Sequence, residues 1–265
     1  MVALHRSEER GTFGVVLAHD DVGTGPALVF VHGLGSDRTR WAPVVERLAG
    51  EFRCISVDLP GHGASGDEGC DALSATVAVR ETWTALDVEV PIVVGHSLGS
   101  VVALLSAALF APRSVVAVDP VHLYTPHLCE HLAPFRERLL GDDFDAAFAE
   151  WEQTLDLGPV DDAERAAIFS GLHPRAETVR SYWRVVLDPV AAAAGQAPMT
   201  AALAGITVPT LVVCAATPTP EDTAILDQMA TTTVEVVPGA GHFLHLVDPD
   251  GFALRLRHWV RELGG

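Results

Sequence analysis

Short runs of apolar and β-branched residues recur along the chain and alternate with longer amphipathic or alanine-rich segments. Such runs are typical of strands that are buried on both faces of a parallel sheet, and helices are expected between them. The predicted strands are 13–18, 27–31, 54–57, 91–94, 114–118, 210–213 and 233–237. The main predicted helices are 39–49, 74–86, 98–110, 223–229 and 249–263. This alternation predicts an α/β fold whose mostly parallel sheet carries helices on both faces.

One long interval interrupts the alternation, because no convincing strand occurs from about residue 121 to about residue 206. Helical patterns occur there at 134–140, 144–155 and 163–170, and the alanine-rich stretch 191–197 is expected to be a loop. An interval of this length is too long for an ordinary loop in a compact domain. We therefore expect a helical lid at 121–206, inserted between two parts of a core domain at 1–120 and 207–265.

Two glycine-containing motifs carry the candidate chemistry. Gly95-His-Ser-Leu-Gly99 lies directly between a predicted strand and a predicted helix. In that setting the pattern G-x-S-x-G is typical of a nucleophile elbow, a sharp strained turn that exposes the Ser97 hydroxyl. Acyl transfer also needs two backbone N–H donors for the developing oxyanion. Leu98 is the candidate for one donor, and Leu34, in the motif His32-Gly-Leu-Gly35, is the candidate for the other.

The order of these motifs resembles that of α/β-hydrolase fold proteins over nearly the whole chain. His32–Gly35 and Gly95–Gly99 enclose Asp58-Leu-Pro-Gly-His-Gly-Ala-Ser65, and Gly239-Ala-Gly-His-Phe243 comes last. The resemblance implies that His242 is the general base of a triad in the order Ser, acid, His. It also implies that Asp58 and His62 belong to a structural turn. We expect His245, three residues after His242, to be structural or to support the base.

The acid of the triad is less obvious. The mechanism needs a carboxylate that accepts the Nδ1–H of His242. In much of the family this acid follows the strand predicted here at 210–213, where this chain has Ala-Ala-Thr-Pro-Thr-Pro. Glu221 and Asp222 come later, at a helix start, where acidic residues have an ordinary capping role. Asp119, at the end of the strand 114–118, is therefore the favoured acid, with Glu221 and Asp222 as alternatives.

A closer resemblance connects the chain with the zearalenone lactonases. It is carried by Ala215-Ala-Thr-Pro-Thr219, by the spacing of Trp183, Pro198 and Leu203, and by Pro238-Gly-x-x-His242-Phe243. It implies that the acid follows the earlier strand and that Trp183 is a platform for the substrate. The chain departs from that pattern, because Asp119 stands where a glutamate is implied and the oxyanion loop begins with His32. Trp151 and Tyr182 are further candidates for contact with an apolar substrate.

The charged residues exclude several other classes of function. The chain has 17 basic and 35 acidic residues, a net charge of −18, and no lysine or asparagine. The lack of lysine excludes a Schiff-base or P-loop lysine, and the lack of basic clusters argues against nucleic-acid or anionic-membrane partners. Cys54, Cys70, Cys129 and Cys214 form no C-x-x-C pair. His122, His127 and His131 lack a convincing fourth ligand, so neither a metal nor a cofactor is expected.

The expected function is that of a cofactor-free serine hydrolase, which cleaves a small apolar ester or lactone through an acyl-enzyme. A C–C bond hydrolase, an acyltransferase and a slow-turnover small-molecule receptor remain as alternatives, and the oligomeric state is undetermined. The first ten residues lack the apolar stretch of a signal peptide. No apolar run reaches the ~18 to 20 residues of a membrane span. A cytoplasmic location is therefore expected.

Overall fold

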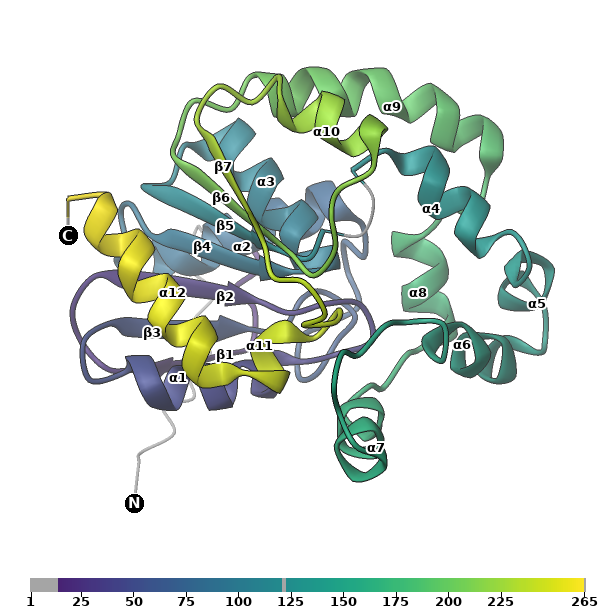
Figure 1. Ribbon diagram of the computed structural model, residues 1–265, viewed down its shortest axis with the longest axis horizontal. Helices are drawn as coiled ribbons and strands as arrows, with labels where there is room; N and C mark the ends of the chain where they lie inside the picture. Colours follow the sequence, from purple (N-terminus) through teal and green to yellow (C-terminus); the bar gives the residue numbers. More distant parts are fainter. Residues whose placement is uncertain (1–13, 121–122, 265) are drawn as a thin grey trace.

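A seven-stranded sheet forms the centre of the molecule (Figure 1). The computed structural model describes residues 14–120 and 123–264. The strands are β1 His19–Val22, β2 Ala27–Val31, β3 Arg53–Val57, β4 Ile92–His96, β5 Ser114–Val118, β6 Thr210–Cys214 and β7 Thr232–Val236. Their spatial order is β1-β3-β2-β4-β5-β6-β7. Among these described strands, β1 pairs with β3 in antiparallel fashion and all other pairings are parallel, so the carboxyl ends of β2 to β7 meet at one edge.

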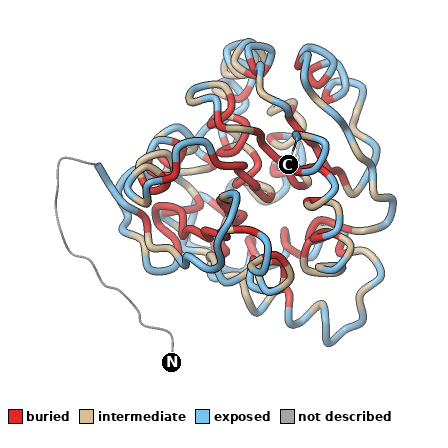
Figure 2. Tube along the Cα trace, turned by 90° about the vertical axis from the view of Figure 1, so that its left-hand side faces the viewer, coloured by how far each residue is buried: buried red, intermediate tan, exposed pale blue. Residues whose placement is uncertain are grey.

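Helices cover both faces of this sheet. One face carries η1 Arg38–Trp41, α1 Ala42–Leu48, α11 Leu244–Val247 and α12 Pro249–Glu262, and the other carries α2 Ala72–Ala85, α3 Leu98–Phe110 and α10 Pro220–Leu226. Side chains alternate between the two faces along each strand. In β2, Leu28 and Phe30 therefore pack with α1 and α12, while Val29 and Val31 pack with α2 and α3. The central strands are buried on both faces, which explains their continuous apolar sequences (Figure 2).

Six helices lie between β5 and β6 among the described residues, and we call them the inserted helices. They are α4 Thr125–Leu132, α5 Arg136–Leu140, α6 Phe144–Glu152, α7 Asp162–Ser170, α8 Ala176–Tyr182 and α9 Pro189–Ala204. Phe144, Phe148, Trp151, Val179 and Trp183 lie in a separate apolar core among them. The long helix α9 packs back against α3, α4 and α10. No helix within the described ranges is long and apolar enough to cross a membrane.

The predicted fold class is confirmed, and two local predictions were wrong. Residues 14–18 form no strand; the edge strand is His19–Val22, which pairs with β3, and Phe13 lies outside the described residues. The expected loop 191–197 is part of α9. That helix begins where Asp188 accepts hydrogen bonds from the N–H groups of Val190 and Ala191, with Pro189 in the first turn. A capping aspartate followed by proline is a helix start that outweighs the low complexity of the stretch.

Candidate active site

Ser97 occupies a sharp turn between β4 and α3. Its backbone has φ 53° and ψ −116°, and its N–H donates to the Val118 carbonyl at 3.0 Å. The glycines on either side of Ser97 are required because neither position has room for a side chain. A Cβ on Gly95 would lie 1.9 Å from the Gly99 oxygen, and one on Gly99 would lie 2.2 Å from the Val31 oxygen. The turn thus holds Ser97 half-buried at the N-terminus of α3, whose unpaired N–H groups favour negative charge.

The loop after β2 lies against this turn, and two buried histidines hold it. His32 donates from Nδ1 to the Gly33 carbonyl at 2.7 Å and accepts the Leu59 N–H at Nε2 at 3.0 Å. His62 donates from Nδ1 to the Pro60 carbonyl at 3.0 Å and accepts the Gly35 N–H at 3.1 Å. Burial lowers the pKa of His32 to about 4 and that of His62 to about 3. Both rings are therefore neutral near pH 7 and can accept these hydrogen bonds.

The two candidate oxyanion donors come from different elements beside Ser97. Leu34 comes from the loop after β2, Leu98 is the first residue of α3, and both line the same cavity as Ser97. A Cβ on Gly33 would lie 3.2 Å from the Ser97 Cβ, so this loop passes close to the elbow. The arrangement can bring two backbone N–H groups to one developing oxyanion.

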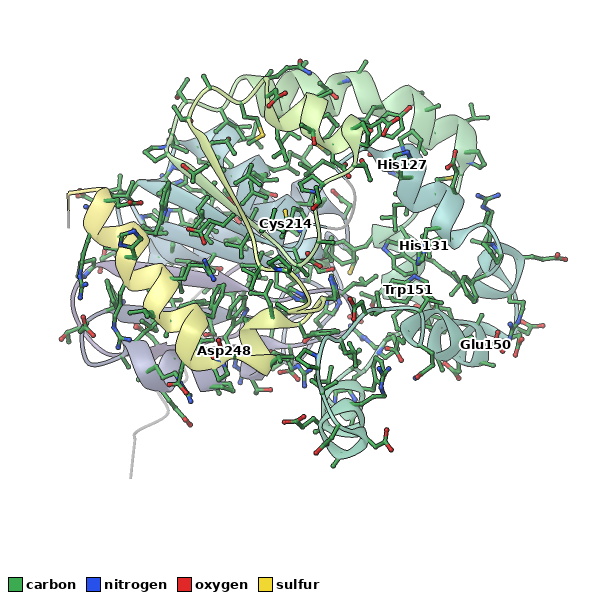
Figure 3. The ribbon with its side chains drawn as sticks, viewed as in Figure 1. His127, His131, Glu150, Trp151, Cys214 and Asp248 are labelled. Atoms are coloured by element: carbon green, nitrogen blue, oxygen red, sulfur yellow. The ribbon has the colours of Figure 1, made fainter. Side chains whose placement is uncertain are left out.

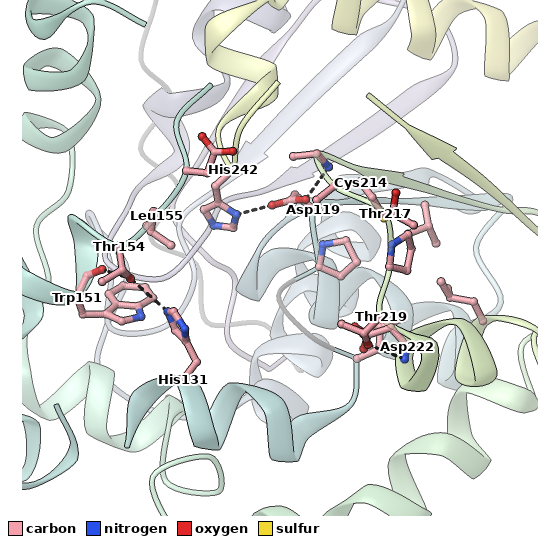
Figure 4. Close-up of a pocket in the computed structure, with 18 residues that line it drawn as sticks. Asp119, His131, Trp151, Thr154, Leu155, Cys214, Thr217, Thr219, Asp222 and His242 are labelled. Atoms are coloured by element: carbon pink, nitrogen blue, oxygen red, sulfur yellow. Dashed lines mark hydrogen bonds and ion pairs between the residues drawn. The ribbon is translucent and has the colours of Figure 1, made fainter. Parts of the chain in front are cut away.

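Asp119 and His242 are joined directly. The Nδ1 of His242 lies 2.7 Å from Oδ2 of Asp119, while Oδ1 of Asp119 accepts the Ala215 N–H at 2.8 Å (Figure 4). Asp119 follows β5 with φ 44°, and its own N–H donates to the Val213 carbonyl at 2.7 Å. The Ala-Ala-Thr-Pro-Thr-Pro loop, which has no carboxylate of its own, thus supplies a backbone donor that orients the carboxylate of Asp119.

The main chain of His242 is fixed from two sides. Its N–H donates to the Asp156 carbonyl at 2.6 Å, and its carbonyl accepts the Nε2–H of His96 at 2.8 Å. The His96 ring centroid lies 4.6 Å from that of His242 and 4.4 Å from that of His245. Burial holds the pKa values of His96 and His245 well below the usual range, so both rings are neutral. Sequence reasoning missed His96 and Asp156, although His96 lies inside the elbow motif.

The alternative acids lie elsewhere. Asp222 accepts the Tyr124 N–H at 2.7 Å and the hydroxyl of Thr219, the N-cap residue of α10, at 2.8 Å, so it links the start of α10 to the chain before α4. Glu221 is exposed, with its carboxylate 4.0 Å from Nε2 of His127. Asp58 is buried and accepts the N–H groups of Arg38 and Ala64 at 2.7 and 2.8 Å, as expected of a structural turn. Asp119 is thus the carboxylate that the structure brings to His242.

A cavity of about 600 Å³, which we call the main cavity, opens beside Ser97 and His242. Its walls are mostly apolar and include Leu34, Leu98, Leu128, Trp151, Leu155, Tyr182, Trp183, Met199, Leu203 and Phe243. Trp151 and Trp183 meet edge to face, with ring centroids 4.8 Å apart. The Tyr182 hydroxyl donates to the Pro60 carbonyl at 3.1 Å, so its ring faces the cavity while its polar atom is satisfied. Leu128 and Met199 were missed because neither α4 nor α9 was predicted.

The structure also bears on the metal candidates. Within residues 14–120 and 123–264, no group of three histidine, cysteine, aspartate or glutamate side chains could hold a metal ion. His122 lies outside the described residues, and His131 instead lies 3.2 Å from the Thr154 hydroxyl. All four cysteines are free thiols, and burial raises the pKa of Cys214 to about 12, so that thiol is protonated.

Two relatives of known sequence match different shares of this chain. The chain is 27% identical over 254 residues to 2-succinyl-6-hydroxy-2,4-cyclohexadiene-1-carboxylate synthase of Serratia proteamaculans, and the match covers 90% of this chain and 94% of that enzyme. An uncharacterized protein of Mycobacterium tuberculosis is 41% identical over 90 residues, which are 33% of this chain and 26% of that protein. The second match therefore extends over only a minor part of the mycobacterial protein.

Solved structures resemble the chain over nearly its whole length. A thermophilic esterase from Thermogutta terrifontis is 25% identical, with a TM-score of 0.66 and 93% of each chain covered. Est816, described as an N-acyl homoserine lactone degrading enzyme, is 21% identical, with a TM-score of 0.69 and coverage of 91% of this chain and 96% of that one. The second likeness shows the fold alone. The model of the Alpha/beta hydrolase family matches residues 28–255, and with this match the chain belongs to the alpha/beta hydrolase family.

Proposed function

We propose that the protein is a serine hydrolase that cleaves a carboxylic ester or lactone through an acyl-enzyme. Ser97 is the nucleophile, His242 the general base and Asp119 the acid of the triad. The observation that supports this proposal most directly is the 2.7 Å contact between His242 and Asp119 beside the Ser97 elbow. The N–H groups of Leu34 and Leu98 serve as the oxyanion donors.

The proposed reaction proceeds in two stages. As Ser97 Oγ attacks the carbonyl carbon, His242 takes its proton, and Asp119 stabilises the imidazolium that forms. The oxyanion of the tetrahedral intermediate binds the two backbone N–H groups, and His242 then gives its proton to the leaving alkoxide. In the second stage, His242 activates a water molecule that attacks the acyl carbon. The acid is released and the Ser97 hydroxyl is restored.

The walls of the main cavity support a substrate with considerable apolar surface. A volume of about 600 Å³ is within the range of small-molecule sites, ~300–1,000 Å³. Trp183, which is 7% exposed, presents its ring to this cavity and serves in the proposal as a substrate platform. The similarity to the Thermogutta esterase agrees with an ester substrate. A resorcylic macrolactone of the zearalenone type is the specific substrate that we propose to test first.

The alternatives within the family are less well supported by the cavity. The name of the Serratia relative describes a product that carries carboxylates, whereas Arg184 is the one arginine among the described residues that line the main cavity. Arg184 is itself exposed at the cavity rim. An uncharged ester therefore fits these walls better than a polyanion. An acyltransferase would differ in preferring an alcohol acceptor over water, and a receptor would bind its ligand without measurable turnover.

The proposal is tested by hydrolysis of p-nitrophenyl acetate and of a resorcylic macrolactone. We expect the wild type to turn over both and Ser97→Ala to lose activity by a factor on the order of 10³ or more. Ser170→Ala, at an exposed serine of α7, is the matched control and should retain full activity. Mass spectrometry of an acid-quenched reaction should detect an acyl group on Ser97. Activity retained in Ser97→Ala would contradict the proposal, and cleavage of only the acetate would leave an esterase without macrolactone specificity.

A further inference from the structure

A second, smaller cavity lies on the acid side of His242, and we call it the side cavity (Figure 4). Its volume is about 260 Å³. The ends of β5 and β6, the loop before α10 and the loop after α6 surround it. Ser97, Leu34 and Leu98 line the main cavity only, whereas His242 and Trp151 line both. The two cavities therefore adjoin at His242 and Trp151.

The walls of the side cavity differ chemically from those of the main cavity. Its residues include Asp119, Asp156, Asp222, Thr154, Thr217 and Thr219, and no arginine of the described ranges lines it. Thr154, Asp156 and Thr217 are exposed, so the cavity opens to solvent between the inserted helices and the loop before α10. Figure 3 shows His131 and Trp151 on one side of this opening and Cys214, at the end of β6, on the other. These walls offer oxygen acceptors to hydroxyl groups and repel anions.

One buried donor in the shared wall lacks a partner. Trp151 is 8% exposed, and its indole Nε1 is buried without a hydrogen-bond partner in the part of the chain that the structure describes. In Figure 4 the indole nitrogen lies on the side of the ring that faces His131 and the side cavity. Buried N–H groups are nearly always paired in folded proteins. An unpaired donor in a cavity wall is therefore available to an oxygen atom of a ligand.

We propose that the side cavity binds the alcohol part of the substrate, and that this part is neutral and carries a hydroxyl or carbonyl oxygen. This inference rests on the proposed hydrolase function. His242 must protonate the leaving oxygen as the bond between the acyl carbon and that oxygen breaks. The alcohol part consequently leaves Ser97 on the side of His242, where the side cavity begins. The acyl part stays in the apolar main cavity, and Trp151 donates its N–H to an oxygen of the alcohol part.

A series of esters with one acyl group and different alcohols tests this assignment. Hexanoyl esters of glycerol, ethanol and lactate present a neutral polyol, an apolar alcohol and an anion. For the wild type we expect kcat/KM to be about tenfold higher for the glyceryl ester than for the ethyl ester, as one hydrogen bond implies. The lactyl ester, which carries a carboxylate, should be about tenfold slower than the ethyl ester.

Two substitutions test whether the dependence of kcat/KM on the alcohol part arises in the side cavity. Trp151→Phe keeps a buried ring but removes the N–H, and it should bring the ratio of glyceryl to ethyl kcat/KM close to one. Because both esters share an acyl group, changes in the main cavity cancel in this ratio. Thr217→Arg adds a cation at the exposed rim and should raise kcat/KM for the lactyl ester about tenfold. Thr233→Arg, at an exposed position of the edge strand β7, is the matched charge control and should change none of the ratios.

The outcomes separate the two proposals. Hydrolysis of all three esters at equal rates, or ratios unaffected by Trp151→Phe and Thr217→Arg, would overturn the alcohol subsite and leave the hydrolase function standing. Failure of the wild type to hydrolyse any ester, including p-nitrophenyl acetate, would overturn the hydrolase function and the subsite with it. A lactyl ester preferred by the wild type would show that the side cavity accepts anions, contrary to the assignment.

Discussion

Ser97 and Asp119 both have a positive φ, at 53° and 44° respectively, although neither is glycine. Such backbone costs about 1–3 kcal/mol per residue and persists only where the surroundings enforce it. Here a backbone hydrogen bond to the next strand holds each residue in place. Ser97 donates its N–H to Val118, and Asp119 donates its N–H to Val213. The two strained residues thus stand at the ends of adjacent strands, and Asp119 contacts His242 from there.

His62 is expected to act as a positioning residue for the oxyanion loop. His62→Phe removes the acceptor for the Gly35 N–H, so the Leu34 donor loses its fixed position. Because these donors act mainly on the transition state, kcat should fall by about 10- to 100-fold while KM changes little. His62→Gln, which can still accept, should recover part of the loss. His258→Phe, at an exposed histidine of α12, is the control. A rise in KM alone would assign His62 to substrate binding instead.

Trp183 is expected to contribute to both packing and binding. It lies in the core of the inserted helices, with Phe148 at 5.8 Å and Trp151 at 4.8 Å between ring centroids. Trp183→Ala should therefore lower the free energy of unfolding by about 3–5 kcal/mol. It should also raise KM for a bulky ester more than for p-nitrophenyl acetate, measured with folded protein. Equal changes in KM for the two esters would contradict a role as substrate platform.

The residues that sequence reasoning could name are those whose type carries chemistry. Ser97 and His242 stand in glycine motifs, and Asp119 emerged because the loop after 210–213 lacks a carboxylate. Ala215 and Asp156, by contrast, contribute only backbone groups to this site. Every residue has a backbone carbonyl, and every residue except proline has a backbone N–H. No sequence pattern could therefore identify these two contacts.

The elbow between β4 and α3 leaves no room for a side chain at Gly95. A Cβ at Gly95 would lie 1.9 Å from a backbone oxygen, so Gly95→Ala must displace the first turn of α3. We expect a loss of at least about 2 kcal/mol in the free energy of unfolding, with reduced kcat. Gly50→Ala, where a Cβ meets nothing within 4 Å, should be nearly neutral in a urea titration. Full stability and activity in Gly95→Ala would contradict the close packing.

At the level of elements, the sheet was easier to predict than the inserted helices. The strands β2, β4, β5 and β6 are apolar at nearly every position because both of their faces are buried. In α9 the sequence Ala191-Ala-Ala-Ala-Gly-Gln-Ala197 has no clear apolar stripe, and Pro198 lies inside the helix. Its helical state depends on capping by Asp188 and on packing against α3 and α10. Tertiary contacts of this kind are not readable from local periodicity.

For the whole molecule, four buried neutral histidines predict a loss of stability in mild acid. The pKa is lowered to about 4 for His32 and about 3 for His62, and it lies well below the usual range for His96 and His245. The unfolded chain binds protons at these groups below about pH 6.5, whereas the folded chain does not. Stability contributed by these groups is therefore complete above pH 6.5 and is lost as the pH falls toward 4.

Urea unfolding at pH 7.5 and pH 5.5 measures this effect. We expect the free energy of unfolding to fall by about 2–4 kcal/mol at the lower pH. Glu152 opposes the trend, because burial raises its pKa to about 7 and favours the folded state as the pH falls. Acidification also relieves the repulsion expected from a net charge of −18. Equal or greater stability at pH 5.5 would contradict the prediction that the histidine contribution outweighs these two effects.

The central claim is that Asp119, reached from the end of β5, is the acid that serves His242. The most direct test is kcat/KM for p-nitrophenyl acetate in Asp119→Asn and in the matched variant Glu221→Gln. We predict a loss on the order of 10³- to 10⁴-fold for Asp119→Asn, because the amide would stabilise the wrong tautomer of His242. Glu221→Gln should remain within about twofold of the wild type, as exposed substitutions usually do. The reverse ranking would contradict the account and move the acid to the loop after β6.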